Sequence, residues 1–251
     1  MSAMIDSLPL DRVDGPIVIL TGAGVSKESG IDTFRDKGGV WTRYNLEEVA
    51  TPEGYAADPA KVHRFYNERR KALLAEDIRP NPAHQAIARL EEGWPHPVLT
   101  VTQNIDDLHE RGGARNLLHM HGELLKMRCA DCDAVHDWRE EASVESVCPA
   151  CGRAGHVRPH VVWFGETPFF MDQIEAALAE AALFVAIGTS ATVYPAAGFV
   201  MAAREFGCPL TLEMNLEETD GSGFFHHTIE GPAGESVPAL VDRLLALRGR
   251  A

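Results

Sequence analysis

Four short apolar runs, each followed at once by small or polar residues, constrain the fold of this chain most. The runs cover residues 16–21, 97–102, 183–187 and 209–214. Continuous apolar runs of this length are typical of strands that are buried on both faces of a parallel sheet. We therefore expect a parallel sheet to form the centre of the molecule.

Helical patterns lie between these runs. Segments 83–92, 172–182 and 236–248 carry one-sided apolar stripes with the 3.6-residue period of a helix, and Asp172 is the expected N-cap of the second. Strands that alternate with helices predict an α/β fold with a doubly wound, Rossmann-like parallel sheet.

The ends of the four strands predict a ligand site. They are followed by Gly-Ala-Gly at 22–24, Gln-Asn-Ile-Asp at 103–106, Gly-Thr-Ser at 188–190 and Asn215. Ligands of open α/β sheets bind outside the carboxyl ends of the strands, where these four segments converge. The pattern indicates a nucleotide-binding enzyme.

The first of these segments opens a glycine loop at residues 22–30. Gly22 allows a tight turn after the strand, Gly24 allows a close backbone approach, and a helix N-terminus then faces the ligand phosphates. Lys27 stands where the usual dinucleotide pattern has a small residue, and the third glycine comes late, at Gly30. Taken alone, the loop fits a phosphate site or an ordinary strand-to-helix turn.

Four of the five cysteines form two CxxC pairs separated by fifteen residues, a zinc-ribbon spacing. Four thiolates close a tetrahedron and leave no open position for substrate, so we expect one structural Zn²⁺ rather than a catalytic one. Redox dithiols and unmetallated thiols are the alternatives. The remaining cysteine, Cys208, is expected to be a small core residue. The predicted ligands are Cys129, Cys132, Cys148 and Cys151.

Two inserts interrupt the α/β pattern. Residues 34–80 have helical patches at 51–55 and 61–74, and residues 126–158 contain the CxxC pairs. We predict a Rossmann-like nucleotide-binding domain from residues 1–35, 80–125 and 157–251. A helical insert at 36–79 and the zinc ribbon at 126–156 are expected to form a small domain.

The net charge of −14 argues against non-specific binding to nucleic acid or anionic lipid. An acidic surface would attract basic, lysine-bearing segments, or it serves solubility alone. The chain shows neither an apolar run of membrane-spanning length nor the basic, apolar start of a signal peptide. We expect a cytoplasmic monomer without membrane or direct nucleic-acid partners.

A histidine pair occurs in His119-Met120-His121-Gly122. His121 fits a base, a metal ligand or a packed core residue. Glu123 and Asp106 are the candidates for orienting it.

In this order, the motifs are similar to those of the sirtuins, which are NAD-dependent protein-lysine deacylases. The similarity covers most of the chain, from Ile17 to Ala233. It rests on GAGVSKESGIDTFR at 22–35, TQNID at 102–106, HGEL at 121–124, the two CxxC pairs, VVWFGE at 161–166, GTS at 188–190 and Asn215.

The resemblance implies a role for each site residue, with NAD as co-substrate and acylated protein lysines as substrates. The general base would be His121. Cofactor binding would fall to Gly22, Ala23, Gly24, Phe34, Arg35, Trp41, Gln103, Asn104, Ile105, Asp106, Gly188, Thr189, Ser190, Asn215, Leu216, Glu217 and Ala233. The substrate backbone would pair, as an added strand, with Val162, Trp163, Phe164, Gly165 and Glu166.

The implied reaction consumes NAD instead of moving hydride. The acyl-lysine amide oxygen attacks the ribose carbon as nicotinamide leaves, and His121 then activates a ribose hydroxyl. The products are free lysine and O-acyl-ADP-ribose.

One departure points to a subgroup. Asp32 and Thr33 replace the Pro-Asp that precedes Phe-Arg in the common deacetylase pattern. Tyr66 and Arg69 share one face of an expected helix, where a phenol and a guanidinium can bind one carboxylate. This resembles the sirtuins that remove succinyl and malonyl groups, and deacetylase activity is expected alongside. The alternative is that Arg69 is one of several surface charges in 64–71.

Two competing functions stay open at this point. The same NAD site would serve a protein ADP-ribosyltransferase, and a non-catalytic zinc-ribbon module would bind nucleic acid or protein. The acidic charge counts against the second of these.

Overall fold

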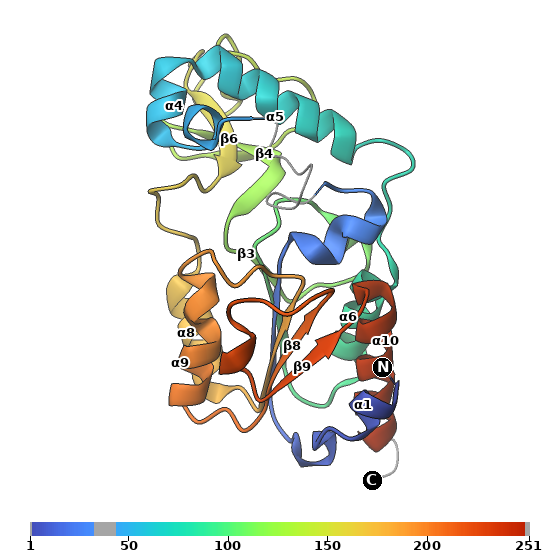
Figure 1. The fold of residues 1–251 in the computed structure, drawn as a ribbon. Coiled ribbons are helices and arrows are strands. Elements are labelled where there is room, and N and C mark those ends of the chain that lie inside the picture. Colours follow the sequence, from blue (N-terminus) through green and yellow to red (C-terminus); the bar gives the residue numbers. More distant parts are fainter. Residues whose placement is uncertain (1, 33–43, 249–251) are drawn as a thin grey trace.

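The computed structural model describes residues 2–32 and 44–248. The larger part is a sheet with helices on both faces, and the smaller part lies beyond the carboxyl ends of the strands of that sheet (Figure 1). This confirms the predicted α/β fold.

The large sheet has six parallel strands in the order β3-β2-β1-β7-β8-β9. Every residue of β1 is buried, which explains its continuous apolar run. In register, Ile17 of β1 lies opposite Val98 on one side and Leu183 on the other. The strands are β1 (Ile17–Thr21), β2 (Val98–Thr102), β3 (Leu117–His119), β7 (Leu183–Ile187), β8 (Thr211–Asn215) and β9 (His227–Glu230).

The four predicted strands are present within two residues of their expected ends, but β3 and β9 were not predicted. These two are the edge strands. Edge strands are short and face solvent along one side, so they carry little of the apolar pattern that identifies a central strand.

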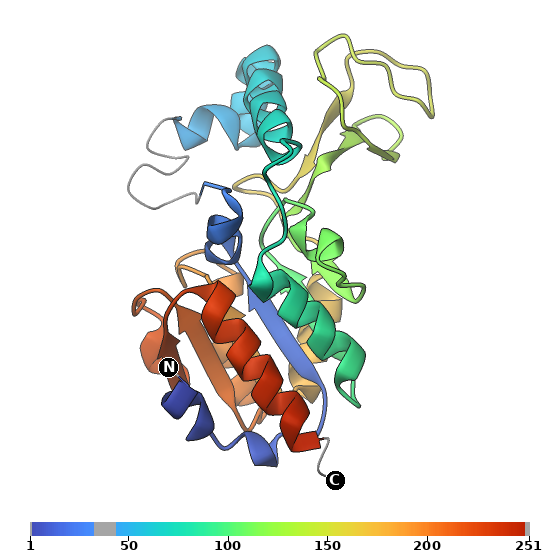
Figure 2. The ribbon, with the colours of Figure 1, turned by 90° about the vertical axis from the view of Figure 1, so that its right-hand side faces the viewer.

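Helices cover both faces of the sheet (Figure 2). The first face packs against α1 (Ser2–Asp6), α6 (Pro82–Gly93) and α10 (Ala233–Arg248). The second packs against α8 (Met171–Glu180) and α9 (Phe199–Glu205). The connections hold η1 (Leu10–Arg12), η2 (Ala23–Ser29), α7 (Leu108–Arg111), η3 (Ala196–Gly198) and η4 (Ser222–Phe224).

The expected cap of α8 is wrong. That helix begins at Met171 after Phe170, which has φ of 63° and makes no side-chain cap bond. Asp172 instead lies in the first helical turn, where a negative charge interacts favourably with the helix dipole.

The smaller part joins three helices to a three-stranded antiparallel sheet. The helices are α3 (Leu46–Val49), α4 (Pro52–Ala57) and α5 (Pro59–Leu73), and the sheet order is β5 (Val135–Asp137), β4 (Gly122–Cys129), β6 (Val157–Val161). Thr51 and Asp58 cap α4 and α5, and each precedes a proline at the first helical position. Such caps satisfy free N–H groups and fix where these helices begin.

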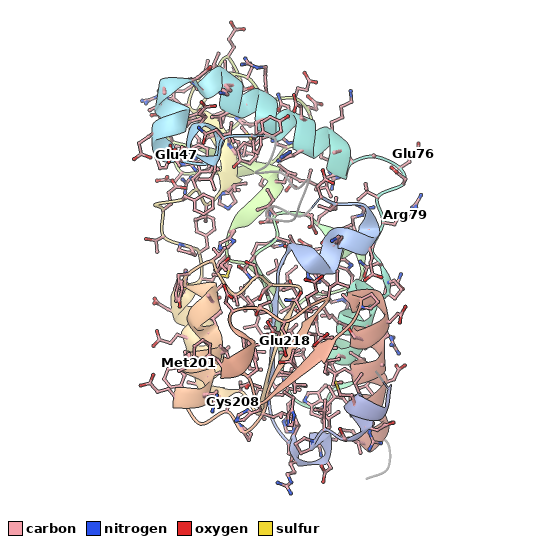
Figure 3. All side chains as sticks on the ribbon, in the orientation of Figure 1. Glu47, Glu76, Arg79, Met201, Cys208 and Glu218 are labelled. Atoms are coloured by element: carbon pink, nitrogen blue, oxygen red, sulfur yellow. The ribbon has the colours of Figure 1, made fainter. Side chains whose placement is uncertain are left out.

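The domain boundaries stay a prediction. The small sheet takes β6, which we had placed with the large domain, and β4 starts at Gly122, before the expected ribbon. Cys208, labelled in Figure 3, is buried, and its thiol donates to the Leu210 carbonyl at 3.2 Å, which confirms a core role. Among the described residues, none of the helices is both long and apolar enough to cross a membrane.

Candidate functional site

Three glycines join β1 to β7 at the carboxyl edge of the sheet. Gly24 donates its N–H to the Gly188 carbonyl at 2.9 Å, and a Cβ on Gly24 would lie 2.7 Å from the Gly188 Cα. A Cβ on Gly22 would lie 2.6 Å from the same carbonyl oxygen. The absence of side chains at Gly22 and Gly24 therefore lets the loop after β7 approach the loop after β1 closely. This place is also the switch point of the sheet, where ligands of such folds bind.

A cavity of about 820 Å³ opens beside these glycines and reaches the smaller part of the molecule. Its volume is in the range of small-molecule and cofactor sites. Among the described residues, the predicted site positions that line it are Gly22, Ala23, Gly24, Tyr66, Arg69, Gln103, Asn104, Ile105, His121, Val162, Trp163, Phe164, Gly165, Glu166, Gly188, Thr189, Ser190, Asn215, Leu216, Glu217 and Ala233.

Four predicted cofactor residues do not appear in that lining. Phe34, Arg35 and Trp41 lie outside the described residues. The Asp106 carboxylate is buried, and it accepts hydrogen bonds from the Ser26 hydroxyl at 3.0 Å and the Leu108 N–H at 3.1 Å. Burial raises the pKa of Asp106 to about 6.

His121 has the geometry of a neutral base. Its Nδ1 lies 3.1 Å from the Gln103 carbonyl oxygen, which can only accept, so Nδ1 carries the proton and Nε2 keeps a free lone pair. Burial lowers the pKa of His121, which keeps the ring neutral near pH 7.

The expected orienting partners of His121 are wrong. Glu123 accepts from the Lys126 ammonium at 2.7 Å, and Asp106 binds Ser26. A backbone carbonyl, that of Gln103, takes this role instead. The sequence offered no signal for it, because every residue carries such a carbonyl.

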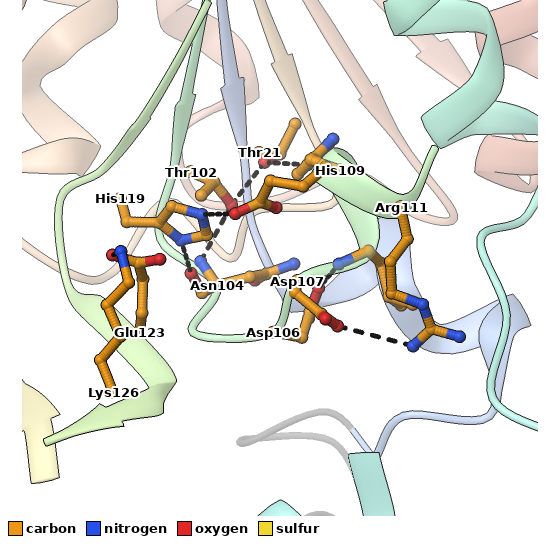
Figure 4. Close-up of polar contacts among 12 residues, drawn as sticks. Thr21, Thr102, Asn104, Asp106, Asp107, His109, Arg111, His119, Glu123 and Lys126 are labelled. Carbon is orange, nitrogen blue, oxygen red and sulfur yellow. Dashed lines mark hydrogen bonds and ion pairs between the residues drawn. The ribbon is translucent and has the colours of Figure 1, made fainter. Parts of the chain in front are cut away.

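Asn104 anchors the 103–106 loop to the glycine turn. Its side-chain amide donates to the Gly22 carbonyl and to the Ser26 hydroxyl, each at 3.1 Å. Its own N–H donates to the Thr102 hydroxyl at 3.1 Å. These buried bonds fix the loop against the sheet edge. Figure 4 shows Asn104 beside Thr102.

Tyr66 lines the cavity, and its hydroxyl is hydrogen-bonded. The side chain is 3% exposed, and its oxygen accepts from the Trp163 indole N–H at 2.9 Å. Burial raises the pKa of Tyr66 to about 12, so the group stays a phenol. Because an indole N–H can only donate, the phenolic proton is left for another acceptor.

Arg69 lies on the same helix, α5. Its guanidinium is stacked over the Phe65 ring at 4.0 Å from the ring centre and lies 5.3 Å from that of Tyr44. Phe65 also lines the cavity but was not predicted. The i, i+4 spacing of Phe65 and Arg69 on a helix is the signal that could have revealed this cation–π pair.

Segment 162–166 is braced from within the chain. Glu166 forms a two-pronged ion pair with Arg158 at 2.6 and 2.9 Å, and it also accepts the Trp163 N–H at 2.8 Å. The N–H groups of Val162 and Phe164 bind the carbonyls of His121 and Ala50. The brace explains how this stretch keeps its shape without strand neighbours.

Further lining residues were not predicted. They share no distinctive spacing, and they include Lys27, Ala50, Val161, Pro168, Val193, Tyr194, Met214, Glu218, Thr219, Asp220 and Gly231, of which Glu218 is labelled in Figure 3.

The four predicted zinc ligands form one cluster. The Sγ atoms of Cys129 and Cys151 are 3.8 Å apart, as are those of Cys132 and Cys148, and all four lie within 4.8 Å of one another. A tetrahedron with zinc–sulfur bonds of about 2.3 Å has edges of about 3.8 Å, whereas a disulfide needs about 2.05 Å. The residues therefore fit a structural Zn²⁺. His136 Nε2, 3.6 Å from the Cys148 sulfur, adds an outer partner.

The cysteine region is also tied to α5. The Asn67 amide exchanges two hydrogen bonds with the backbone of Ala142, at 2.8 and 3.0 Å, and the Arg70 guanidinium donates to the Glu140 carbonyl at 3.2 Å. Arg70 is buried and is also bound by Asn67 at 2.7 Å. The helix that carries Tyr66 and Arg69 is therefore held on its other side by the zinc ribbon.

Comparison with known proteins agrees with this geometry. The model of the Sir2 family matches residues 22–195. An NAD-dependent protein deacylase of Caulobacter vibrioides is 55% identical over 92% of this chain and 97% of its own. The NAD-dependent protein deacylase SIR2rp3 of Trypanosoma brucei brucei is 50% identical over 96% of this chain and 99% of its own.

Solved structures share the whole fold. A Sir2 homologue in complex with NAD has a TM-score of 0.85 at 37% identity, with 98% of this chain and 95% of that chain covered. A Sir2 protein bound to a myristoylated histone peptide has a TM-score of 0.76 at 30% identity, with 100% of both chains covered.

Proposed function

This chain belongs to the Sir2 family, and from that premise we propose that it removes from protein lysines those acyl groups that end in a carboxylate, such as succinyl and malonyl groups. The broader activity is that of an NAD-dependent protein deacylase, with NAD as co-substrate and a structural zinc at the four cysteines. This activity excludes the alternative that the chain is a non-catalytic zinc-ribbon module.

The carboxyl edge of the sheet is the proposed seat of NAD. The tight turn of Gly22 and Gly24 against Gly188 lies at the switch point, and the loops after β1, β2, β7 and β8 all line one cavity. Bound NAD supplies an electrophilic ribose carbon and a leaving nicotinamide. Asn104 and the buried Asp106 hold the neighbouring loop in place.

His121 is the proposed general base. Its Nε2 is the only ring nitrogen free to accept a proton, because Nδ1 donates to Gln103. The lowered pKa keeps that lone pair available at pH 7, as a base acting on a ribose hydroxyl requires. The Gln103 carbonyl fixes the tautomer and stabilises the ring when it becomes charged.

One observation supports the acidic acyl preference most directly: Tyr66 and Arg69 line the same cavity as His121. A guanidinium and a phenolic O–H together offer a carboxylate both charge and directed hydrogen bonds. The guanidinium carbon lies over the rings of Phe65 and Tyr44, which restrict its movement. Such pre-organisation lowers the entropy lost when a carboxylate binds.

The acylated protein chain is proposed to bind along segment 162–166. One Sir2 protein of the same fold has been solved with a myristoylated histone peptide bound, which supports an extended peptide as ligand. The Val162 and Phe164 amides are already bound, so the peptide would use the opposite edge of the segment. On that edge the Trp163 N–H is bound by the Glu166 carboxylate, so a peptide that pairs with Trp163 would have to replace this bond.

A panel of lysine peptides tests the proposal. The peptides share one sequence and carry succinyl, malonyl, acetyl or no acyl group, each with and without NAD. Succinyl and malonyl peptides should give a higher kcat/KM than the acetyl peptide, and only with NAD. If the acetyl peptide were turned over as well as or better than the succinyl and malonyl peptides, the proposed preference for acidic acyl groups would be wrong. Adenine-labelled NAD that labels the protein fraction would instead support the ADP-ribosyltransferase.

A further inference from the structure

Two histidines of one short stretch bind the 103–106 loop in the same way. His121 Nδ1 lies 3.1 Å from the Gln103 carbonyl oxygen, and His119 Nδ1 lies 3.1 Å from the Asn104 carbonyl oxygen. Both carbonyls can only accept, so both histidines donate from Nδ1. His121 and His119 therefore bind two adjacent carbonyl groups of the 103–106 loop.

His119 differs from His121 at the other ring nitrogen. Its Nε2 lies 2.8 Å from a carboxylate oxygen of Glu110, which is part of α7. The carboxylate, when ionised, is also only an acceptor, so a ring that satisfies both bonds carries two protons. His119 is then an imidazolium paired with Glu110.

The surroundings favour this charge. Burial opposes a positive charge on His119, yet the hydrogen bond and negative charge of Glu110 outweigh it and raise the pKa of His119. Glu123 adds negative charge nearby, while Lys126 on the same strand is paired with Glu123. The positive ring also acts on its other neighbours. Burial raises the pKa of Asp106, and the charge of His119 offsets part of that rise. Burial lowers the pKa of His109, and the charge of His119 adds to that lowering.

The same group has the donor atoms of a metal site, because Glu110, His119 and Glu123 lie within 4.8 Å of one another. Both carboxylates already have a cationic partner, Glu110 in His119 and Glu123 in Lys126. A metal ion would have to displace both pairs. The geometry therefore favours an ion pair with a structural task.

We propose that His119, held by Glu110, is a positioning residue that fixes the Asn104 peptide for NAD binding. The inference rests on the proposed placement of NAD beside the 103–106 loop. Asn104 connects this carbonyl to the glycine turn, since its amide binds Gly22 and Ser26. A shift of the Asn104 peptide would also move the adjacent Gln103 carbonyl, which orients His121.

Two substitutions at His119 separate its two bonds. An asparagine amide reaches the position of Nδ1 but not that of Nε2, so His119→Asn keeps the donor to Asn104, whereas His119→Leu removes it. His119→Leu should raise the KM for NAD by about tenfold, because it leaves a buried carbonyl without a partner. His119→Asn should recover most of this loss, and the KM for the acyl peptide should change little in either variant.

His96 provides the matched control. It is a partly exposed histidine that pairs with Asp14 and is not among the residues that line the cavity, so His96→Asn should leave both KM values unchanged. If His119→Leu raised the KM values of NAD and peptide equally, or if His119→Asn behaved like His119→Leu, the positioning role would be wrong.

Nitrogen-15 NMR of histidine-labelled protein tests the ion pair without substrate or turnover. His119 should keep both ring protons to a higher pH than free histidine, and Glu110→Gln should move its titration to lower pH. An unchanged titration in Glu110→Gln would overturn the ion pair. Since this readout needs no acyl substrate, a failure of the proposed acyl preference would leave its result standing.

Discussion

The Trp163 indole donates its N–H to the Tyr66 hydroxyl at 2.9 Å, with both side chains buried. This bond joins α5 to the segment proposed to hold the peptide. It also decides the direction of the phenolic proton, because the indole cannot accept it. Acyl recognition and peptide binding therefore share one hydrogen bond.

Tyr66→Phe should impair both partners of this bond. Desuccinylation should fall by roughly tenfold or more in kcat/KM, since a hydrogen bond to a charged group contributes about 1.5–3 kcal/mol. Deacetylation should fall less. The indole N–H loses its acceptor, so a thermal melt should show lower stability. Equal loss on both substrates would mean that the hydroxyl does not contact the acyl carboxylate.

Arg69→Met should reduce desuccinylation far more than deacetylation, by about a hundredfold, because the acyl carboxylate would lose its only proposed charge partner. Arg64→Met is the matched control, since Arg64 is an exposed arginine of the same helix. Steady-state kinetics with succinyl and acetyl peptides measure the ratio. A similar ratio in the two variants would place Arg69 outside the acyl pocket.

His121→Tyr should abolish turnover while the circular dichroism spectrum stays that of the folded enzyme. In the unsubstituted enzyme, a base must be deprotonated to act, and burial places the pKa of His121 below the 6.5 of free histidine. Activity should therefore hold at pH 7 and fall only as the pH drops through this lowered pKa. If activity instead began to fall while the pH was lowered from alkaline values to pH 7, the assignment of His121 as the base would be contradicted.

Zinc removal should inactivate the enzyme through the fold. Cys148→Ser replaces a buried thiolate ligand with a hydroxyl, which binds Zn²⁺ poorly. We expect less than one equivalent of bound zinc, a lower melting temperature and lost activity. Cys208→Ser, at a cysteine outside the cluster, is the control for zinc content. Full activity in metal-free protein would reject the structural role.

Gly24→Ala should damage the NAD site, because its new Cβ would lie 2.7 Å from the Gly188 Cα. The β1 and β7 loops would have to separate, so NAD binding, followed by calorimetry, should weaken strongly. Gly223→Ala is the control, since a Cβ there meets nothing within 4 Å. If both variants bound NAD equally well, the close contact would be unimportant.

The sequence predicted the central sheet and the zinc ligands well. Continuous apolar strands such as β1 carry a strong local pattern, and the cysteine spacing carries its own geometry. The short edge strands β3 and β9 were missed, because they lack a two-sided apolar pattern.

Contacts through backbone atoms were beyond the sequence. The partner of His121 is the Gln103 carbonyl, not a carboxylate, and no residue type marks such a group. Glu166 binds both the Arg158 guanidinium and the Trp163 N–H, and these contacts likewise depend on the three-dimensional fold. Residue identities indicated which groups meet the ligand, but not what orients them.

The order of the sheet has a consequence for how the protein is made. The central strand β1 is synthesised before both of its partners, which start at residue 98 on one side and residue 183 on the other. Until the ribosome has produced both, an apolar strand that is buried on both faces waits unpaired, a state prone to aggregation and suited to chaperone binding. The glycine turn that opposes Gly188 closes only after that, so a nascent chain that stalls before β7 would have no nucleotide site.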